Sequence, residues 1–199
     1  MLPADNPNIS TIINDYQDSQ KPHYAPFYFW DGWWNSEEDT IKKVVIRRIW
    51  ENHLPCPITD IVGFEYWTRT CKSGQYHGVH IDNDTFLYEE NGVSNSPIAG
   101  AIYYGVDNDN GGFLEIHNKI VVDGDKNVLD RGTIEKYLSE PEDRERIAYK
   151  GNRLIIGDFG HIMHGTTSFT SGTRQALVVS VWTKNLPPLG LSNNRFHYE

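Results

Sequence analysis

Ile61-Val-Gly-Phe-Glu-Tyr-Trp-Thr-Arg-Thr70 is a run of β-branched and aromatic residues that predicts a β-strand. Further strand-like runs follow toward the C-terminus, at 98–105, 113–116, 153–157, 161–167 and 174–183. These runs do not alternate with crossover helices, which disfavours a parallel α/β sheet. The pattern therefore predicts a mainly β chain, folded as a sandwich or an open barrel.

One helix is expected before the strands, at 37–51. Ile41, Val44, Val45 and Ile49 recur at helical spacing, and Ser36 is the expected N-cap. Prolines at positions 55 and 57 end this segment.

The rest of the chain divides around this helix and the strands. Residues 1–23 are polar and predict a loose arm, whereas the aromatic segment 24–34 is expected to pack across the core as a lid or first strand, with direct ligand contact as the alternative. Residues 124–148 are charged and read as an insertion with a short helix near 132–139. We expect a single domain over 1–199: an N-terminal arm and supporting helix (1–60), a catalytic core (61–185) and a C-terminal tail (186–199).

Composition narrows the class of protein. The 199 residues carry a net charge of −9, which disfavours nucleic acid as a partner. The basic cluster Lys42, Lys43, Arg47 and Arg48 is expected to form the solvated face of the helix. The two cysteines are expected to be free thiols, and neither a signal peptide nor a membrane span is visible, so a cytoplasmic protein is expected.

His80-Ile-Asp82, followed far downstream by His164 and then Arg174, forms the constellation that carries chemistry. Residues i and i+2 of a strand share a face, so His80 and Asp82 can bind one ion together. Two imidazoles and one carboxylate can hold one face of iron(II) and leave the other positions open. An arginine such as Arg174 can grip the carboxylate of a dicarboxylate co-substrate.

His161 is a rival for the distal ligand. Three residues separate it from His164, so the two side chains lie on opposite faces of a strand and cannot both reach the same metal.

Together these residues resemble the iron(II)- and 2-oxoglutarate-dependent dioxygenases, in particular the small prolyl-hydroxylase-like members. The resemblance covers about residues 61–183. It rests on His80-x-Asp82, on Tyr103-Tyr104 before Gly111-Gly112-Phe-Leu, and on the stretch from Arg153 through His164 to Gly172-Thr-Arg174.

The resemblance implies a double-stranded β-helix, or jelly roll, with the N-terminal helix packed on one side. It implies that His80, Asp82 and His164 are the catalytic metal ligands, since the ligand of the family lies about ten residues before the arginine. Arg174 and Tyr104 are the implied contacts of 2-oxoglutarate. Strand parity places Tyr103 on the other face, although the two tyrosines could exchange roles.

The implied reaction uses iron(II), 2-oxoglutarate and oxygen to hydroxylate an unactivated C–H bond, with release of succinate and carbon dioxide. The short chain favours a small-molecule substrate such as an amino acid. A peptidyl side chain, a cupin-like isomerase or lyase without 2-oxoglutarate, and a binding protein with a vestigial site are the alternatives. Neither the substrate nor the oligomeric state is specified by any pattern in the chain.

Five other positions are weaker candidates near the site. Tyr66 and Trp67 are possible pocket residues or ordinary core aromatics, and His77 and His117 are possible neighbours of the site mouth. Asp84 is a candidate for binding a substrate amine or, equally, a solvated turn residue within a polar region that continues through 88–97.

Overall fold

The computed structural model describes residues 26–93, 95–107, 111–121, 144–192 and 196. The expected arm at 1–23 and the expected helix near 132–139 lie outside the described residues. No helix in the described part of the chain is long and apolar enough to cross a membrane.

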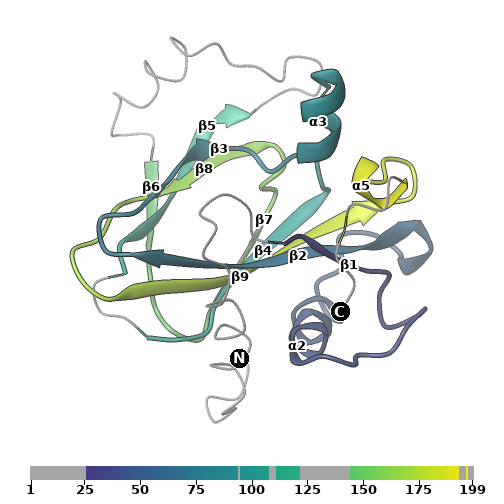
Figure 1. Ribbon diagram of the computed structural model, residues 1–199, viewed down its shortest axis with the longest axis horizontal. Coiled ribbons are helices and arrows are strands. Elements are labelled where there is room, and N and C mark those ends of the chain that lie inside the picture. Colours follow the sequence, from purple (N-terminus) through teal and green to yellow (C-terminus); the bar gives the residue numbers. More distant parts are fainter. Residues whose placement is uncertain (1–25, 94, 108–110, 122–143, 193–195, 197–199) are drawn as a thin grey trace.

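Two antiparallel sheets make up the described strands (Figure 1). The five-stranded sheet has the order β1-β2-β9-β4-β7, from Tyr28–Trp30, Ile61–Lys72, Thr173–Thr183, Ala99–Tyr104 and Arg153–Gly157. The four-stranded sheet has the order β3-β8-β5-β6, from His77–His80, Ile162–Thr166, Phe113–Val121 and Arg144–Ala148. From β2 to β9 the chain passes between the sheets in jelly-roll order, which confirms the expected fold class.

The apolar side chains of these strands divide between two cores. Even-numbered residues of β2, such as Phe64 and Tyr66, join Tyr103 of β4 and Val179 of β9 on the outer face of the five-stranded sheet. Ile102 and Tyr104 of β4 face the other way and pack between the sheets with residues such as Leu114 of β5. The inward face of the five-stranded sheet therefore remains available to line a site.

Helix α2, Ile41–Trp50, covers the outer face of the five-stranded sheet, below it in Figure 1. The expected helix is confirmed, but its start at 37 is wrong by four residues. Thr40 is the N-cap, because its side chain accepts a hydrogen bond from the Lys43 amide. Ser36 is engaged elsewhere, accepting a hydrogen bond from Trp30 Nε1 at 2.8 Å.

The basic cluster on this helix departs from the expected solvated face. Lys42 and Lys43 are both buried. The Lys42 ammonium lies 4.7 Å from the centre of the Tyr28 ring, and Lys43 pairs with Asp39 at 2.6 Å. Arg47 and Arg48 remain more open and pair with glutamates. The cluster thus joins the helix to the segment that precedes it.

The described part of the aromatic segment at 24–34 contributes a strand and packed aromatic side chains to the fold. β1 pairs with β2, and Trp30 and Trp33 pack against Phe64. The first-strand interpretation is confirmed for the described residues of this segment.

Four further short elements were not expected. The polar region at 88–97 begins inside helix α3, Thr85–Asn91, and the C-terminal tail begins with helix α5, Leu189–Ser192. The last five residues of the expected insertion form β6, whose charged residues pair with β5. A short 3-10 turn at Ile58–Asp60 leads into β2.

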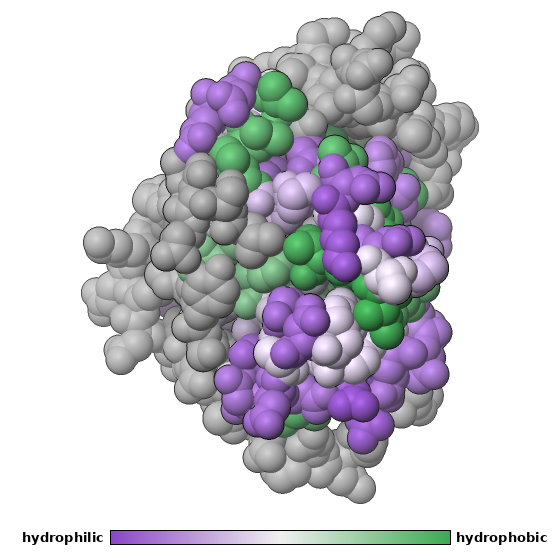
Figure 2. All heavy atoms as spheres, turned by 90° about the vertical axis from the view of Figure 1, so that its right-hand side faces the viewer, coloured by the Kyte–Doolittle hydropathy of each residue, from purple (hydrophilic) through white to green (hydrophobic). Residues whose placement is uncertain are grey.

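The face that carries α3 and α5, on the right of Figure 1, turns toward the viewer in Figure 2. Hydrophilic and hydrophobic residues are interspersed over its described part. The pocket between the two sheets is the feature of the described residues that bears most directly on function.

Candidate metal centre

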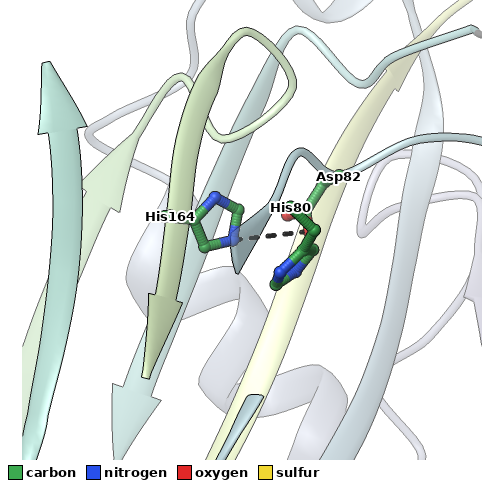
Figure 3. A group of neighbouring side chains, drawn as sticks. All are labelled: His80, Asp82 and His164. Carbon is green, nitrogen blue, oxygen red and sulfur yellow. Dashed lines mark ion pairs between the residues drawn. The ribbon is translucent and has the colours of Figure 1, made fainter. Parts of the chain in front are cut away.

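His80, Asp82 and His164 come together in space although 82 residues of chain separate the last two. One ligand atom from each of them lies within 4.8 Å of the others. The Nε2 atoms of His80 and His164 lie 3.5 Å and 3.7 Å from Asp82 Oδ1 (Figure 3).

Three different backbone positions hold these side chains. His80 is the last residue of β3, and His164 lies in the middle of β8. Asp82 lies beyond the end of β3, so the expectation that His80 and Asp82 share one strand is wrong. Its amide donates a hydrogen bond to the carbonyl of Phe159 at 2.8 Å, which fixes the turn after β3 against the loop before β8.

Both histidines direct the same ring nitrogen toward the centre. Nδ1 of His80 bonds the Gly78 carbonyl at 2.8 Å, and Nδ1 of His164 bonds the Ile162 carbonyl at 3.0 Å. Since a carbonyl oxygen only accepts, each Nδ1 carries a hydrogen and Nε2 is the atom available to a metal.

The electrostatics also suit a cation. Burial lowers the pKa of His164, which keeps this imidazole neutral. Burial acts to raise the pKa of Asp82, but its hydrogen bond to His80 and the charges of the nearby histidines outweigh it and lower that pKa. Asp82 Oδ2 is buried without a hydrogen-bond partner among the described residues. A buried carboxylate oxygen without a donor is costly, and a metal ion would satisfy it.

His161 does not join this group. Its Nδ1 lies 2.8 Å from Asp158 Oδ1, and both side chains are about half exposed. The structure therefore brings His164, rather than His161, to His80 and Asp82.

A pocket opens on the three residues from between the two sheets. Apolar side chains form its middle, with Trp67 on β2, Ile102 on β4 and Val178 on β9 among them. Phe159 lies beside the pocket, packs on the His164 ring with centroids 4.7 Å apart, and occupies the space where a Cβ at Gly100 would come within 2.8 Å of it.

Arg174 lies in the same pocket and is 4% exposed. Its guanidinium donates to the Gly111 carbonyl at 3.1 Å, the Thr167 carbonyl at 3.2 Å and Thr166 Oγ1 at 2.7 Å. All three acceptors are neutral, and no carboxylate of the described residues pairs with this cation. A buried guanidinium held in this way lacks a counter-ion among the described residues and could accept an anion.

Tyr104 accompanies Arg174 in the pocket wall, whereas Tyr103 faces the outer core and donates its hydroxyl to Asn152 Oδ1 at 3.2 Å. Strand parity therefore separates the two tyrosines as expected. Burial raises the pKa of Tyr104 to about 12, so its hydroxyl keeps its proton and can donate a hydrogen bond.

The weaker candidates also divide between residues that line the pocket and residues that lie outside it. Trp67 lines the pocket, but Tyr66 stacks on Tyr28 in the outer core. His77 lines the pocket and packs edge-on against His80, with centroids 4.1 Å apart. His117 is buried and is not among the residues that line this pocket.

Neither expectation for Asp84 is met. The residue is 2% exposed and caps α3, accepting a hydrogen bond from the Leu87 amide at 3.0 Å. Its other oxygen accepts from the Leu189 amide at the start of α5. Asp84 is therefore a structural clamp, with no oxygen left for a substrate amine.

The sequence reasoning missed several pocket residues, and two of them carry polar or reactive side chains. These are Arg69 and Cys71, which line the pocket from β2, beside Trp67. The period of two along this strand places Trp67, Arg69 and Cys71 on one face, and this signal could have identified them.

Comparisons with known proteins show only a weak similarity between this chain and solved structures. No model of a known protein family matches the chain, and no curated protein matches its sequence. A prolyl-4-hydroxylase of Pseudomonas putida is 15% identical with a TM-score of 0.40, over 63% of this chain and 55% of that one. An oxidoreductase of the 2OG-Fe(II) oxygenase family from Burkholderia pseudomallei is 15% identical with a TM-score of 0.39, over 64% and 47%. HygX from Streptomyces hygroscopicus, solved with iron bound, is 13% identical with a TM-score of 0.38, over 64% and 60%.

The chain thus aligns with about half the length of these proteins. The first is named as a prolyl-4-hydroxylase, and the second is named as a member of the 2OG-Fe(II) oxygenase family, which the sequence resembles. At such low similarity the function of this chain has to be argued from its own residues.

Proposed function

We propose that this protein is a non-haem iron(II)- and 2-oxoglutarate-dependent dioxygenase that hydroxylates an unactivated C–H bond of a small molecule, such as an amino acid. One observation carries the proposal. A cluster of two imidazoles and a carboxylate shares one pocket with a buried arginine that no described carboxylate neutralises. A metal site without a dicarboxylate co-substrate has no need of that arginine.

The donor set fits iron(II). Two imidazole nitrogens and one carboxylate oxygen are the facial set typical of non-haem iron oxygenases, and it leaves coordination positions open. His80 and His164 would bind through Nε2, because Nδ1 of each is held by a backbone carbonyl. Asp82 would bind through its carboxylate, whose Oδ2 otherwise lacks a partner among the described groups.

The inner end of the pocket fits the far carboxylate of 2-oxoglutarate. Arg174 is oriented by three neutral oxygens, so its position is set before any ligand arrives. The Tyr104 hydroxyl can act as a second hydrogen-bond donor, since it remains protonated at any physiological pH.

When bound, iron(II) with 2-oxoglutarate and oxygen would supply oxidative decarboxylation to succinate and carbon dioxide, coupled to hydroxylation of the substrate. The chain would contribute position and exclusion of water. The apolar middle of the pocket, including Ile102 and Val178, keeps water away from the reacting bond and offers an apolar surface to the substrate.

The test is an anaerobic titration of the metal-free protein with iron(II), followed by 2-oxoglutarate. We expect iron to bind and the weak visible charge-transfer band of the iron–2-oxoglutarate chelate to appear. Iron binding without the band would favour a cupin-like enzyme that does not use 2-oxoglutarate. Failure to bind iron would show that the cluster is vestigial.

A further inference from the structure

Arg69 is a second cation in the pocket. It lies on β2 between Trp67 and Cys71 in the pocket-facing row and is half-buried. No hydrogen bond or ion pair joins its guanidinium to any residue that the structure describes. This half-buried guanidinium therefore has no hydrogen-bond or ion-pair partner among the described residues, and binding of an anion would supply one.

The strand register places Arg69 close to Arg174. Arg69 pairs with Ala176, and Cys71 pairs with Arg174, so the two arginines are diagonal neighbours on β2 and β9. Such neighbours are about 7–8 Å apart between Cα atoms. Among the described residues that line the pocket, Asp82 carries the only carboxylate, and it belongs to the metal cluster. Two positive charges thus share a pocket with no free negative charge, and each of them favours an anionic ligand.

The two arginines differ in how they are held. Arg174 is fixed by three hydrogen bonds, whereas Arg69 makes none to the described residues. Arg69 lines the same pocket as His77 and the metal cluster. His77 in turn packs against His80. Arg69 therefore borders the space in front of the metal cluster, where a substrate has to lie.

This space is at an open side of the sandwich. β3 is the end strand of its sheet, and among the described strands β1 covers β2 only as far as Tyr66. Beyond that point Trp67 and Arg69 stand at the margin between the two sheets. The Trp67 ring is held edge-on by Phe27, with centroids 5.1 Å apart, and can pack against an apolar group beside the charge of Arg69.

We propose that Arg69 binds a carboxylate of the substrate, and that the substrate is therefore a small carboxylic acid whose apolar part packs against Trp67. The inference rests on the proposed function, because it assigns Arg174 to 2-oxoglutarate and leaves Arg69 for the substrate. It narrows the substrate class from small molecules in general to small carboxylates.

The experiment compares acids with their amides. Wild-type protein and the Arg69→Gln variant are loaded anaerobically with iron(II) and 2-oxoglutarate and titrated calorimetrically with free amino acids, simple carboxylic acids and the primary amide of each. The control is Lys72→Gln, which removes one positive charge from an exposed position at the end of the same strand. Formation of the iron–2-oxoglutarate band is measured first for all three proteins.

We expect at least one acid to bind the wild type about tenfold or more tightly than its amide, as a charged hydrogen bond of this kind predicts. Arg69→Gln should bring acid and amide to within about twofold, while Lys72→Gln keeps the preference. Arg69→Lys should retain part of it, because the charge remains while the planar fork is lost.

Three results would overturn the inference while the proposed function stands. No acid in the panel binds more tightly than its amide, or Arg69→Gln retains the full preference, or Arg69→Gln weakens 2-oxoglutarate as strongly as a variant of Arg174 does. If the wild type does not form the iron–2-oxoglutarate band at all, the proposed function has failed and the assignment of Arg69 fails with it.

Discussion

His80 and His164 are direct cross-strand partners on β3 and β8, with ring centroids 4.4 Å apart. Residues paired in this way on an antiparallel ladder project from the same face of the sheet. The ladder between the two strands therefore sets the distance between the two imidazoles, and Asp82 reaches the same centre from the turn that follows β3.

The first prediction concerns the distal histidine. His164→Ala removes one of three ligand atoms and should weaken iron(II) binding by about 100-fold or more, since a site left with two ligands loses both affinity and geometry. His161→Ala should bind iron like the wild type, because His161 pairs with Asp158 away from the cluster. Anaerobic equilibrium dialysis with iron(II) measures both variants.

The two variants are compared in stability as well as in iron binding. His164 is buried and His161 is half exposed, so the free energy of unfolding of each metal-free variant shows whether a loss of iron binding comes from a general effect on folding. Loss of iron binding in His161→Ala together with full binding in His164→Ala would show that the assignment of the ligand is wrong.

A second prediction separates the co-substrate site from the metal site. Arg174→Lys should raise the apparent Kd for 2-oxoglutarate about tenfold or more, because lysine cannot reproduce the bidentate grip of guanidinium on a carboxylate. Iron(II) affinity should change by less than about threefold, since Arg174 is not among the clustered ligands. The strength of the iron–2-oxoglutarate band against 2-oxoglutarate concentration gives the first value, and dialysis gives the second. Arg48→Lys, at an exposed site on α2, is the control.

The third prediction compares adjacent tyrosines. Tyr104→Phe should weaken 2-oxoglutarate by about threefold to tenfold, the value of one lost hydrogen bond of about 1 kcal/mol. Tyr103→Phe should leave this affinity unchanged and instead lose the hydrogen bond to Asn152 on the other side of the sheet. Equal 2-oxoglutarate affinity in the wild type and Tyr104→Phe would remove Tyr104 from the proposed contacts.

The strands could be predicted from the sequence because their signal is local. β2 and β9 are long β-branched and aromatic runs, and a period of two correctly separates the pocket-facing Tyr104 from Tyr103. Helix α2 was predicted from the spacing of its apolar residues. Its first residue was not, because Trp30, six residues earlier in the chain, engages the Ser36 side chain and leaves Thr40 as the cap.

Tertiary contacts explain the other misses. β6 is charged and has no strand-like pattern, yet its Arg144 and Arg146 pair with Glu115 of the neighbouring strand. Asp84 looks like a solvated turn residue until α5, more than a hundred residues later, supplies a donor to its second oxygen. No local pattern reports a partner that arrives from so far along the chain.

The fourth prediction follows from this role of Asp84. Asp84→Ala removes the cap of α3 and leaves the Leu189 amide without its acceptor, so it should lower the free energy of unfolding by about 2 kcal/mol. Asp60→Ala, at an exposed position, should change it by less than about 0.5 kcal/mol. Urea denaturation of the two variants and the wild type gives the comparison. Equal stability of Asp84→Ala and the wild type would contradict the clamp.

The last prediction concerns Glu65, whose side chain points to the inside of the sandwich and accepts a hydrogen bond from Trp182 Nε1 at 2.8 Å. Burial, with the charges of Asp84 and Asp82 adding to it and the Trp182 bond opposing it, raises the pKa of Glu65 to about 8. The folded state therefore keeps the proton that the unfolded state loses near pH 4.5. It follows that the contribution of Glu65 to stability falls as pH rises from about 5 to 8, by at most about 1.4 kcal/mol per pH unit.

Glu65→Gln keeps the shape and an acceptor for Trp182 but cannot ionise. The variant should gain stability relative to the wild type as pH rises from 5 to 8, and the difference should shrink toward its smallest value below the unfolded pKa. Urea denaturation of the metal-free proteins at pH 5 and pH 8 measures this, with Glu145→Gln at an exposed position as the control. A difference between Glu65→Gln and the wild type that stays constant with pH would mean that Glu65 is already ionised in the folded protein, and that its burial is compensated by a partner other than Trp182.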